Sequence, residues 1–426
     1  MHRNEIVAAA PTLSDPSTVQ YQLDCSGPVR AYFSSRRMFV RYQVDLRRVP
    51  DSLLLVPLLG SVAPIAWVLG ARLRLPVVDA SFLAALQVVR ESLRRMYPGL
   101  DWSGEICADS VVDTAVETPE RTALLFSGGV DSLVSYVRHR RENPLLVSVW
   151  GADIGLAQQQ RWDEVAAANR DFARDRGLEL SIVTTNFRTF FNHYKLRARF
   201  LESFENWYSG IQQGLGLVTL CAPLSHTHRV GRVLIAASHA ADWDRPWGSH
   251  PSIDNHVRWA ATEVSHDGYE QTRQMKLKVL ADFIRNDDND LQIRVCWGRA
   301  ANCSHCAKCA ITIVGLLLEG LDPNVHGFRC DAAGLERIRR EIETGHMYLG
   351  GSAESKWGEI QRCIASRRPV AIEGVDEFMA WLETISIRDC QRKSRDRAGA
   401  RVRRYLERRP EPIGRWLRLA LGHPFP

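Results

Sequence analysis

A glycine-rich segment between an apolar run and an amphipathic run constrains the fold of this chain more than any other feature. Residues 122–126 are apolar and rich in strand-favouring residues, the sequence SGGVDS follows at 127–132, and residues 133–138 carry apolar side chains at helical spacing. Adjacent glycines allow a tight turn and a close approach of the backbone to a ligand. A helix that begins at such a loop directs its N–H groups and the positive end of its dipole to one point, where an anion is favoured. The segment therefore predicts a strand, an anion-binding loop and a helix.

Strand-like and helix-like runs alternate through the middle of the chain. Further strands are expected at 145–150, 179–184, 232–237 and 291–296, and helices between them at 161–176, 197–207, 214–226 and 271–285. This alternation predicts an α/β fold with a doubly wound parallel sheet wrapped by helices. Ligands of such sheets bind beyond the carboxyl ends of the strands. The loop at 127–132 follows the first of these strands and the segment 238–259 follows the fourth, so we expect both to face the same crevice.

The length of 426 residues predicts two or three domains. We place an N-terminal α+β region at 1–118, with one or two strands within 32–46 and a helix at 80–96. The α/β domain follows at 119–330. A helical region occupies 331–426, with helices expected at 332–344, 354–366, 375–392, 396–408 and 415–421.

The segment 238–259 is rich in Gly, Pro, Asp, His and Trp, which makes it more than a plain connector. Asp242, Trp247 and Asp254 are candidate substrate-binding residues, because carboxylates and flat apolar surfaces suit a planar polar heterocycle. Trp243 and Trp259 offer further flat surface. The alternative is an ordered surface loop whose tryptophans pack on the core.

Four of the ten cysteines lie within fourteen residues, at Cys296, Cys303, Cys306 and Cys309. In a reducing compartment this density indicates a metal site, and four thiolates match a closed tetrahedral zinc site of structural type. His305 lies inside the group and is a competing ligand. An iron–sulfur cluster is the main alternative, because the spacing does not distinguish the two.

The basic charge of the chain is concentrated at its C-terminal end. Residues 390–426 hold eleven Lys and Arg against three Asp and Glu, a local net charge of +8, whereas the whole chain has +6. This tail could bind nucleic acid, which we do not favour, or an acidic protein partner, or be a solvated helix face. No apolar run reaches eighteen residues and the N-terminus lacks a signal-peptide profile, so we expect no membrane span and a cytoplasmic location.

The sequence SGGVDS after a strand resembles the PP-loop of the N-type ATP pyrophosphatases, whereas no Walker A motif occurs. Together with the four cysteines after the last expected strand, it resembles the 7-cyano-7-deazaguanine synthases over about residues 120–320. The resemblance implies a PP-loop (HUP-like) fold, ATP and Mg²⁺ at the loop, and Zn²⁺ at Cys296, Cys303, Cys306 and Cys309. The ATP-binding residues it implies are Ser127, Gly128, Gly129, Val130, Asp131 and Ser132, of which Ser127, Asp131 and Ser132 are candidate catalytic residues. Lys276, near the start of an expected helix, is a further candidate for the phosphates; its alternative is a solvated cation.

The resemblance implies an ATP-dependent carbon–nitrogen ligase. Such an enzyme activates a 7-carboxy-7-deazaguanine-type carboxylate as an acyl-adenylate, releases pyrophosphate, and passes the acyl group to an amine. Asp254 looks like the substrate-reading acid of this family. The chain departs from the biosynthetic enzymes by a shorter first cysteine gap, by Ser304-His305 in place of a glycine, and by its greater length. Long relatives of this kind look like members of bacterial anti-phage gene clusters, for which we expect a protein amine as acceptor in place of ammonia and a protein acceptor or operon partner.

Two other functions stay open on the residues alone. One is a tRNA-modifying PP-loop enzyme that uses the basic tail as an RNA clamp. The other is a nucleotide-gated partner module without catalysis.

Overall fold

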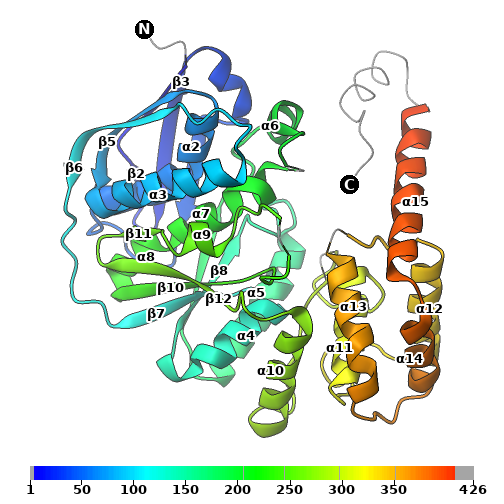
Figure 1. The fold of residues 1–426 in the computed structure, drawn as a ribbon. Helices are drawn as coiled ribbons and strands as arrows, with labels where there is room; N and C mark the ends of the chain where they lie inside the picture. Colours follow the sequence, from blue (N-terminus) through cyan, green and yellow to red (C-terminus); the bar gives the residue numbers. More distant parts are fainter. Residues whose placement is uncertain (1–3, 205, 244, 297, 351, 408–426) are drawn as a thin grey trace. The chain divides into compact units, whose positions relative to one another are not determined.

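The computed structural model describes residues 4–407 except 205, 244, 297 and 351, and its contacts divide the chain into two units (Figure 1). The first unit consists of Met1–Ser127, Asp131–Ser238 and Asp244–Tyr269. The second consists of Gly128–Val130, His239–Trp243 and Glu270–Pro426.

A large, mostly parallel sheet forms the first unit, and this confirms the α/β fold. Five parallel strands lie in the spatial order β12, β10, β7, β8, β9. Their bounds are β7 (Arg121–Leu125), β8 (Leu145–Trp150), β9 (Leu180–Thr185), β10 (Val230–Ala236) and β12 (Thr262–Asp267). Four of the five predicted strands are therefore present within a residue or two of their expected limits.

The fifth predicted strand is wrong. Residues 291–296 form neither strand nor helix, and the fifth parallel strand is β12, which pairs with β10. Residues 291–296 alternate like a strand, but the Asn302 side chain takes up part of their backbone: its Oδ1 accepts from the N–H groups of Val295 and Cys296 at 2.9 and 3.3 Å. The stretch that precedes Cys303 is thus bonded to the cysteine loop.

The N-terminal strands continue the same sheet. Their bounds are β1 (Glu5–Ala8), β2 (Thr12–Asp15), β3 (Thr18–Cys25), β4 (Arg37–Arg41), β5 (Arg72–Asp79) and β6 (Glu105–Val112). Strand β4 pairs antiparallel with β9, with Val40 opposite Thr185, and β3, β1, β5 and β6 follow outward. The described strands thus form one twelve-stranded sheet, which ends at the short strand β11 (Arg258–Trp259) on the other side.

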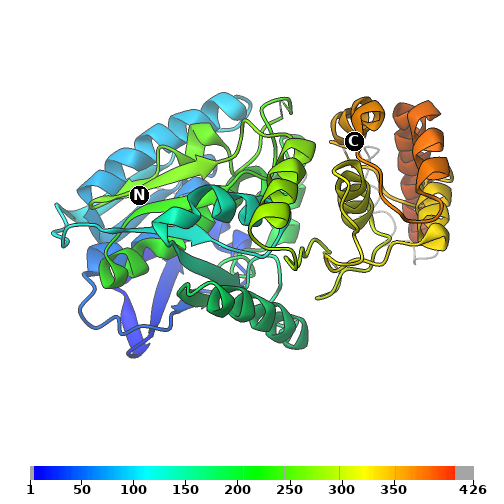
Figure 2. The same cartoon turned by 90° about the horizontal axis from the view of Figure 1, so that it is seen from below.

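Helices lie on both faces of this sheet (Figure 2). On one face α2, α3, α7 and α9 pack on one another, and on the other α5 packs against β8 and β9. The helices are α1 (Asp51–Leu54), α2 (Val56–Val68), α3 (Ala80–Met96), α4 (Val130–His139), α5 (Gln159–Asp175), α6 (His193–Phe200), α7 (Gln213–Val218), α8 (Ala222–His228) and α9 (Pro251–Asp254). The short turns are η1 (Gly27–Tyr32), η2 (Arg140–Glu142), η3 (Tyr208–Gln212) and η4 (Thr219–Cys221), of which η3 is π-helical.

Helix α3 shows why these residues fold as they do. Asp79 caps its N-terminus by accepting from the N–H of Phe82 at 2.9 Å, and Phe82, Leu86 and Val89 bury one face completely. The observed bounds of α3 equal the predicted 80–96. The helix expected at 197–207 lies earlier, at α6, and the one expected at 214–226 is split into α7, η4 and α8.

The described part of the second unit is helical. Its helices are α10 (Arg273–Asn286), α11 (Ala307–Leu318), α12 (Ala332–Glu343), α13 (Ala353–Cys363), α14 (Val375–Thr384) and α15 (Ile387–Glu407), with the short turn η5 (Ile364–Ser366) after α13. The break expected between 392 and 396 falls instead at 385–386, and the helix expected at 415–421 lies outside the described residues. Among the described helices, none combines the length and apolar character needed to cross a bilayer.

Candidate functional site

The order of the parallel strands places the candidate site. Strand β7 lies between β10 and β8, so successive strands run outward on one side of β7 and then return to its other side. Such a reversal leaves a crevice at the carboxyl ends of the two strands concerned. The loop at 127–132 begins at the carboxyl end of β7 and the segment from residue 237 begins at that of β10, so the two start from neighbouring parallel strands.

The glycine loop closes on itself through its two serines. Gly128 has φ +71°, a left-handed conformation that glycine adopts without strain, and α4 begins two residues later. The N–H of Ser127 donates to Oγ of Ser132 at 3.3 Å, and the two hydroxyl oxygens also lie 3.3 Å apart. Ser127 is exposed and Ser132 is buried. Asp131 lies in the first turn of α4, where the helix dipole stabilises a carboxylate.

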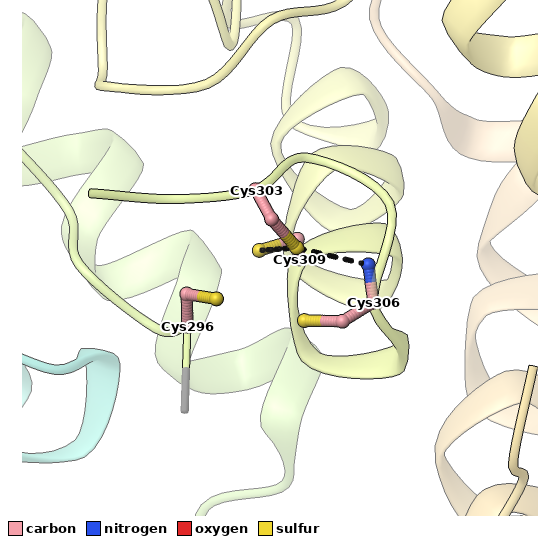
Figure 3. A group of neighbouring side chains, drawn as sticks. All are labelled: Cys296, Cys303, Cys306 and Cys309. Atoms are coloured by element: carbon pink, nitrogen blue, oxygen red, sulfur yellow. Dashed lines mark hydrogen bonds between the residues drawn. The ribbon is translucent and has the colours of Figure 1, made fainter. Parts of the chain in front are cut away.

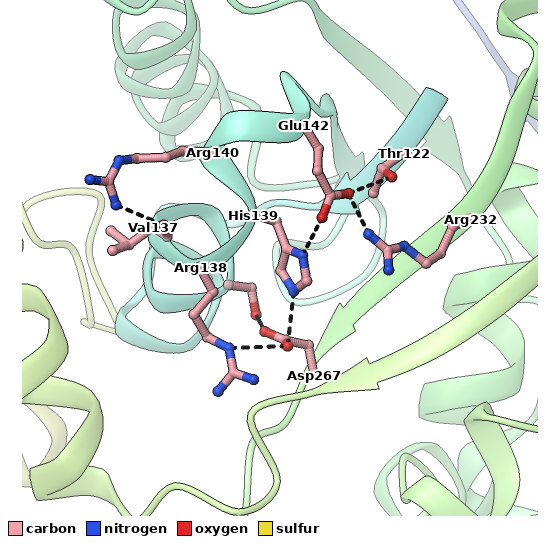
Figure 4. A network of polar contacts seen from close by, with 9 residues as sticks. Thr122, Val137, Arg138, His139, Arg140, Glu142, Arg232 and Asp267 are labelled. Atoms are coloured by element: carbon pink, nitrogen blue, oxygen red, sulfur yellow. Dashed lines mark hydrogen bonds and ion pairs between the residues drawn. The ribbon is translucent and has the colours of Figure 1, made fainter. Parts of the chain in front are cut away.

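A buried carboxylate on β12 fixes the helix that follows the loop (Figure 4). Asp267 accepts from Oγ of Ser135 at 2.6 Å, and its Oδ1 lies 3.1 Å from Nε2 of His139 and 3.3 Å from Nε of Arg138. All three partners belong to α4, whereas Asp267 ends the strand two places away in the sheet. Asp267 therefore sets the position of α4, and through it the start of the loop.

A second carboxylate joins α4 to the strands on either side of the switch point (Figure 4). Glu142 accepts from Oγ1 of Thr122 at 2.7 Å, lies 2.8 Å from Nδ1 of His139, and is paired with Arg232. Burial by itself would raise the pKa of this carboxyl, but the hydrogen bonds from Arg232, His139 and Thr122 outweigh it and lower the pKa of Glu142 to about 2. Glu142 thus ties β7, β10 and the end of α4 together as a carboxylate.

Asp254, the expected substrate-reading acid, is fully buried. Its Oδ2 accepts from Oγ of Ser249 and lies 2.8 Å from Nδ1 of His266, while its Oδ1 has no hydrogen-bond partner among the described residues. A Cβ added to Gly214 would stand 2.1 Å from that Oδ1, so the helix α7 backbone packs directly against the carboxylate. Ser249 and His266 therefore hold Oδ2 of the carboxylate, and the α7 backbone lies against Oδ1.

The other candidates of the segment 238–259 separate into two groups. Trp247 is half-buried in the first unit, whereas Asp242 is exposed in the second unit and accepts from Oγ of Ser355 at 2.6 Å. Trp243 stacks on His239, with ring centroids 3.6 Å apart. Trp259, which we expected to offer surface to a ligand, is a core residue: it is fully buried and its Nε1 donates to Oγ of Ser225 at 2.8 Å.

Lys276 lies on α10 in the second unit and is 3% exposed. The expected alternative, a solvated cation, is therefore wrong for this residue.

The four predicted cysteines form one cluster (Figure 3). Their sulfur atoms all lie within 4.8 Å of one another, and Sγ of Cys303 is 3.9 Å from that of Cys309. Thiolates at zinc-bond length around a tetrahedral centre stand about 3.8 Å apart. The group Cys296, Cys303, Cys306 and Cys309 could therefore hold a metal ion such as zinc.

Local backbone geometry explains why these thiols converge. The loop turns at Ser304, which has φ +63°, and the N–H of Cys306 donates to Sγ of Cys303 at 3.3 Å. Cys306 occupies the N-cap position of α11, whose first turn carries Cys309. A hydrogen bond from the Cys309 thiol lowers the pKa of Cys306, which favours the thiolate form of this sulfur. A preformed thiolate suits metal binding, which requires deprotonated ligands.

Asp267 and His266 are functional candidates that the sequence reasoning missed. Both stand at the carboxyl end of β12, and the signal that could have found them is the alternating run TEVSHD at 262–267, which was not assigned as a strand. The carboxyl ends of β7, β10 and β12 thus carry the start of the glycine loop and the buried carboxylate of Asp267, and the buried Asp254 pairs with His266 on β12. Such an edge can bind a phosphate group beside a polar ligand. In the comparisons with known proteins, no protein-family model, no curated protein and no solved structure matches the chain.

Proposed function

We propose that this protein is an ATP-dependent ligase of the PP-loop type, which activates a 7-carboxy-7-deazaguanine-type carboxylate as an acyl-adenylate and transfers the acyl group to an amine. One observation carries the proposal: SGGVDS joins β7 to α4 at the point where the strand order reverses. The Cys296, Cys303, Cys306 and Cys309 cluster supports it, because the resembling enzymes combine the same loop with a four-cysteine zinc site.

The first half-reaction needs charge neutralisation more than it needs a nucleophilic side chain. A carboxylate oxygen of the substrate attacks the α-phosphorus of ATP, and the bond to the bridging oxygen of pyrophosphate breaks. The backbone N–H groups at the start of α4 and the hydroxyls of Ser127 and Ser132 are suited to the negative charge that develops on the pyrophosphate. Mg²⁺, held with Asp131, would supply further neutralisation.

The second half-reaction transfers the activated acyl group. The amine nitrogen bonds to the acyl carbon, the carbon–oxygen bond to AMP breaks with its electron pair, and the nitrogen releases a proton. With ammonia the first product is an amide, whose oxygen a second ATP must adenylate before it leaves with AMP to give the nitrile; with a protein amine the product is a conjugate. A metal at the four cysteines would be structural, because four protein ligands leave no open position for a substrate.

The test follows AMP and pyrophosphate. Incubation of the protein with ATP, Mg²⁺ and 7-carboxy-7-deazaguanine should release both, and Ser132→Ala should slow AMP formation by about 100-fold or more, as loss of one oxyanion donor does. Asp131→Ala should have the same effect. Asp171→Ala, an exposed carboxylate on α5 paired with Arg174, is the matched control and should keep the wild-type rate.

Three results would contradict the proposal. Formation of ADP would mean a different phosphorus is attacked. Release of AMP that requires tRNA and not the carboxylate would favour a tRNA-modifying enzyme. Full activity in both loop variants would remove the loop from the chemistry.

A further inference from the structure

Two buried polar atoms without partners mark the π-helical turn η3. The hydroxyl of Tyr208 and Oε1 of Gln212 are both buried and make no hydrogen bond to any described residue, although the two side chains are 6% and 1% exposed. Buried polar groups in folded proteins are almost always hydrogen-bonded, so each exception needs an explanation. A π-helical turn is rare and recurs at functional sites. The turn η3 therefore points to a ligand.

An arginine with open hydrogen-bonding capacity covers the same turn. The guanidinium of Arg188 lies over the Tyr208 ring, 4.1 Å from its centroid, and Nη1 donates to the Ala152 carbonyl at 2.9 Å. Nε2 of His193 lies 2.7 Å from the Arg188 carbonyl and holds the backbone. Nε and Nη2 of Arg188 have no hydrogen-bond partner among the described residues. Arg188 is thus fixed in place with part of its fork still available, the arrangement in which arginine binds oxyanions.

Contacts with Phe187, the residue before Arg188, bring Tyr208 and Gln212 close to Arg188. Nε2 of Gln212 donates to the carbonyl of Phe187, the residue before Arg188, at 3.1 Å. The same π-helical turn carries Tyr208, whose ring packs edge-on against Phe187 with centroids 6.2 Å apart. The segment 187–188 therefore contacts both Tyr208 and Gln212.

The group lies at the carboxyl ends of β8 and β9 in the first unit. Arg188 follows β9 by three residues and its partner Ala152 follows β8 by two. The close approach of these strand ends depends on Gly151, which has φ +105° and whose added Cβ would stand 1.7 Å from the Thr185 carbonyl oxygen.

We propose that Arg188, Tyr208 and Gln212 form a subsite for an oxyanion that carries a neighbouring N–H or O–H donor. The guanidinium fork and the Tyr208 hydroxyl donate to the oxyanion, and Oε1 of Gln212 accepts from the neighbouring donor. Burial raises the pKa of Tyr208 well above its usual value, so the phenol stays a donor at neutral pH. Asp153 also acts on this hydroxyl, but its carboxylate is exposed, where water screens its repulsion of an anion.

Two ligands of the proposed reaction present this chemistry. One is the carboxylate substrate, whose heterocycle bears ring N–H groups; the other is ATP, which combines phosphate oxyanions with ribose hydroxyls. The identification of the ligand as a reactant rests on the proposed function, whereas the subsite itself rests only on the three side chains.

The experiment measures dissociation constants by titration calorimetry on the full chain. The probes are 7-carboxy-7-deazaguanine, ATP with Mg²⁺, and inorganic phosphate, and the variants are Arg188→Gln and Tyr208→Phe. Arg176→Gln is the matched control, because Arg176 also covers an aromatic ring, that of Phe172 at 3.9 Å, and donates to a carbonyl at 3.1 Å. It lies near the opposite, amino end of β9. Loss of a charged hydrogen bond predicts about 10- to 100-fold weaker binding of at least one probe to Arg188→Gln, with no change in the control.

The probes distinguish the sources of the anion. Weakening for the deazaguanine alone assigns the subsite to the carboxylate, and weakening for ATP or phosphate assigns it to a phosphate. If the deazaguanine does not bind the wild-type protein at all but the ATP or phosphate affinity still falls, the proposed function fails and the subsite stands. Unchanged affinities for every probe in Arg188→Gln, or no binding of any probe to the wild-type protein, overturn the subsite.

Tyr208→Phe guards against a folding artefact. Removing a buried hydroxyl without a protein partner should leave the melting temperature of the ligand-free protein equal or higher. The same variant should weaken binding of the probe that Arg188→Gln affects. A variant that melts lower and binds normally would show that the hydroxyl serves the fold and not a ligand.

Discussion

Replacing Gly151 by alanine tests the close packing at the carboxyl ends of β8 and β9. The added Cβ would meet the Thr185 carbonyl oxygen at 1.7 Å, and the backbone φ of +105° is one that alanine rarely adopts. Left-handed strain and forced backbone displacement each cost about 1–3 kcal/mol, so we expect a loss of about 4 kcal/mol in the free energy of unfolding.

Gly177 provides the matched control. It also has a positive φ, +64°, but an added Cβ would meet nothing within 4 Å. Gly177→Ala should therefore cost only the strain, about 1 kcal/mol. The difference of about 3 kcal/mol corresponds to a melting temperature about 3–6 °C lower for Gly151→Ala than for Gly177→Ala.

Differential scanning calorimetry of both variants measures this difference. A Gly151→Ala protein that melts within about 2 °C of Gly177→Ala would refute the reasoning, because it would mean that the two strand ends can separate at little cost. The same variant should also shift the Ala152 carbonyl away from Arg188 and weaken whichever ligand the subsite binds.

Three further predictions concern the four-cysteine cluster, the hydrogen bond between Ser135 and Asp267, and stability in acid. Purified protein should contain one zinc per chain by mass spectrometry. Cys303→Ser should lose the zinc, and the control Cys107→Ser, which replaces a half-buried thiol on β6, should retain it. Iron in place of zinc would identify an iron–sulfur cluster. Asp267→Ala should lower the free energy of unfolding by about 2–4 kcal/mol because it leaves the buried Ser135 hydroxyl without its partner. Adding Ser135→Ala should recover part of that loss, measured by urea titration. A double variant no more stable than Asp267→Ala would contradict this. The pKa of Glu142 is lowered to about 2, so its contribution to stability is complete above the unfolded pKa and is lost as the pH falls through the folded value. Between about pH 5 and pH 2, Glu142→Gln should therefore lose less free energy of unfolding than the wild-type protein. Equal slopes of the free energy of unfolding against pH for the two proteins would contradict the assignment.

The strand–loop–helix unit at 121–139 could be predicted because its pattern is local. The periodicity changes from strand to helix at a glycine pair, and no distant contact is needed to see it. The four cysteines could be predicted for the same reason, since their ligand geometry follows from close spacing.

Features that depend on distant pairing were not predictable in this way. Strand β12 follows a polar segment, and only its pairing with β10 brings Asp267 to α4. Residues 291–296 alternate like a strand but bond to Asn302, which no periodicity reveals. The orphaned hydroxyl of Tyr208 depends on a π-helical turn, for which the sequence carries no signal that we could recognise.

The pairing of β4 with β9 has a consequence for the folding of this protein during its synthesis. Val40 meets Thr185, so the edge of β4 emerges from the ribosome long before its partner strand has been translated. Until then the nascent chain exposes an unpaired edge, the kind of surface that invites association with other chains. Pairing of this edge thus waits for residue 185, and a factor that shields β4 during translation should raise the yield of folded protein more than one that acts after release.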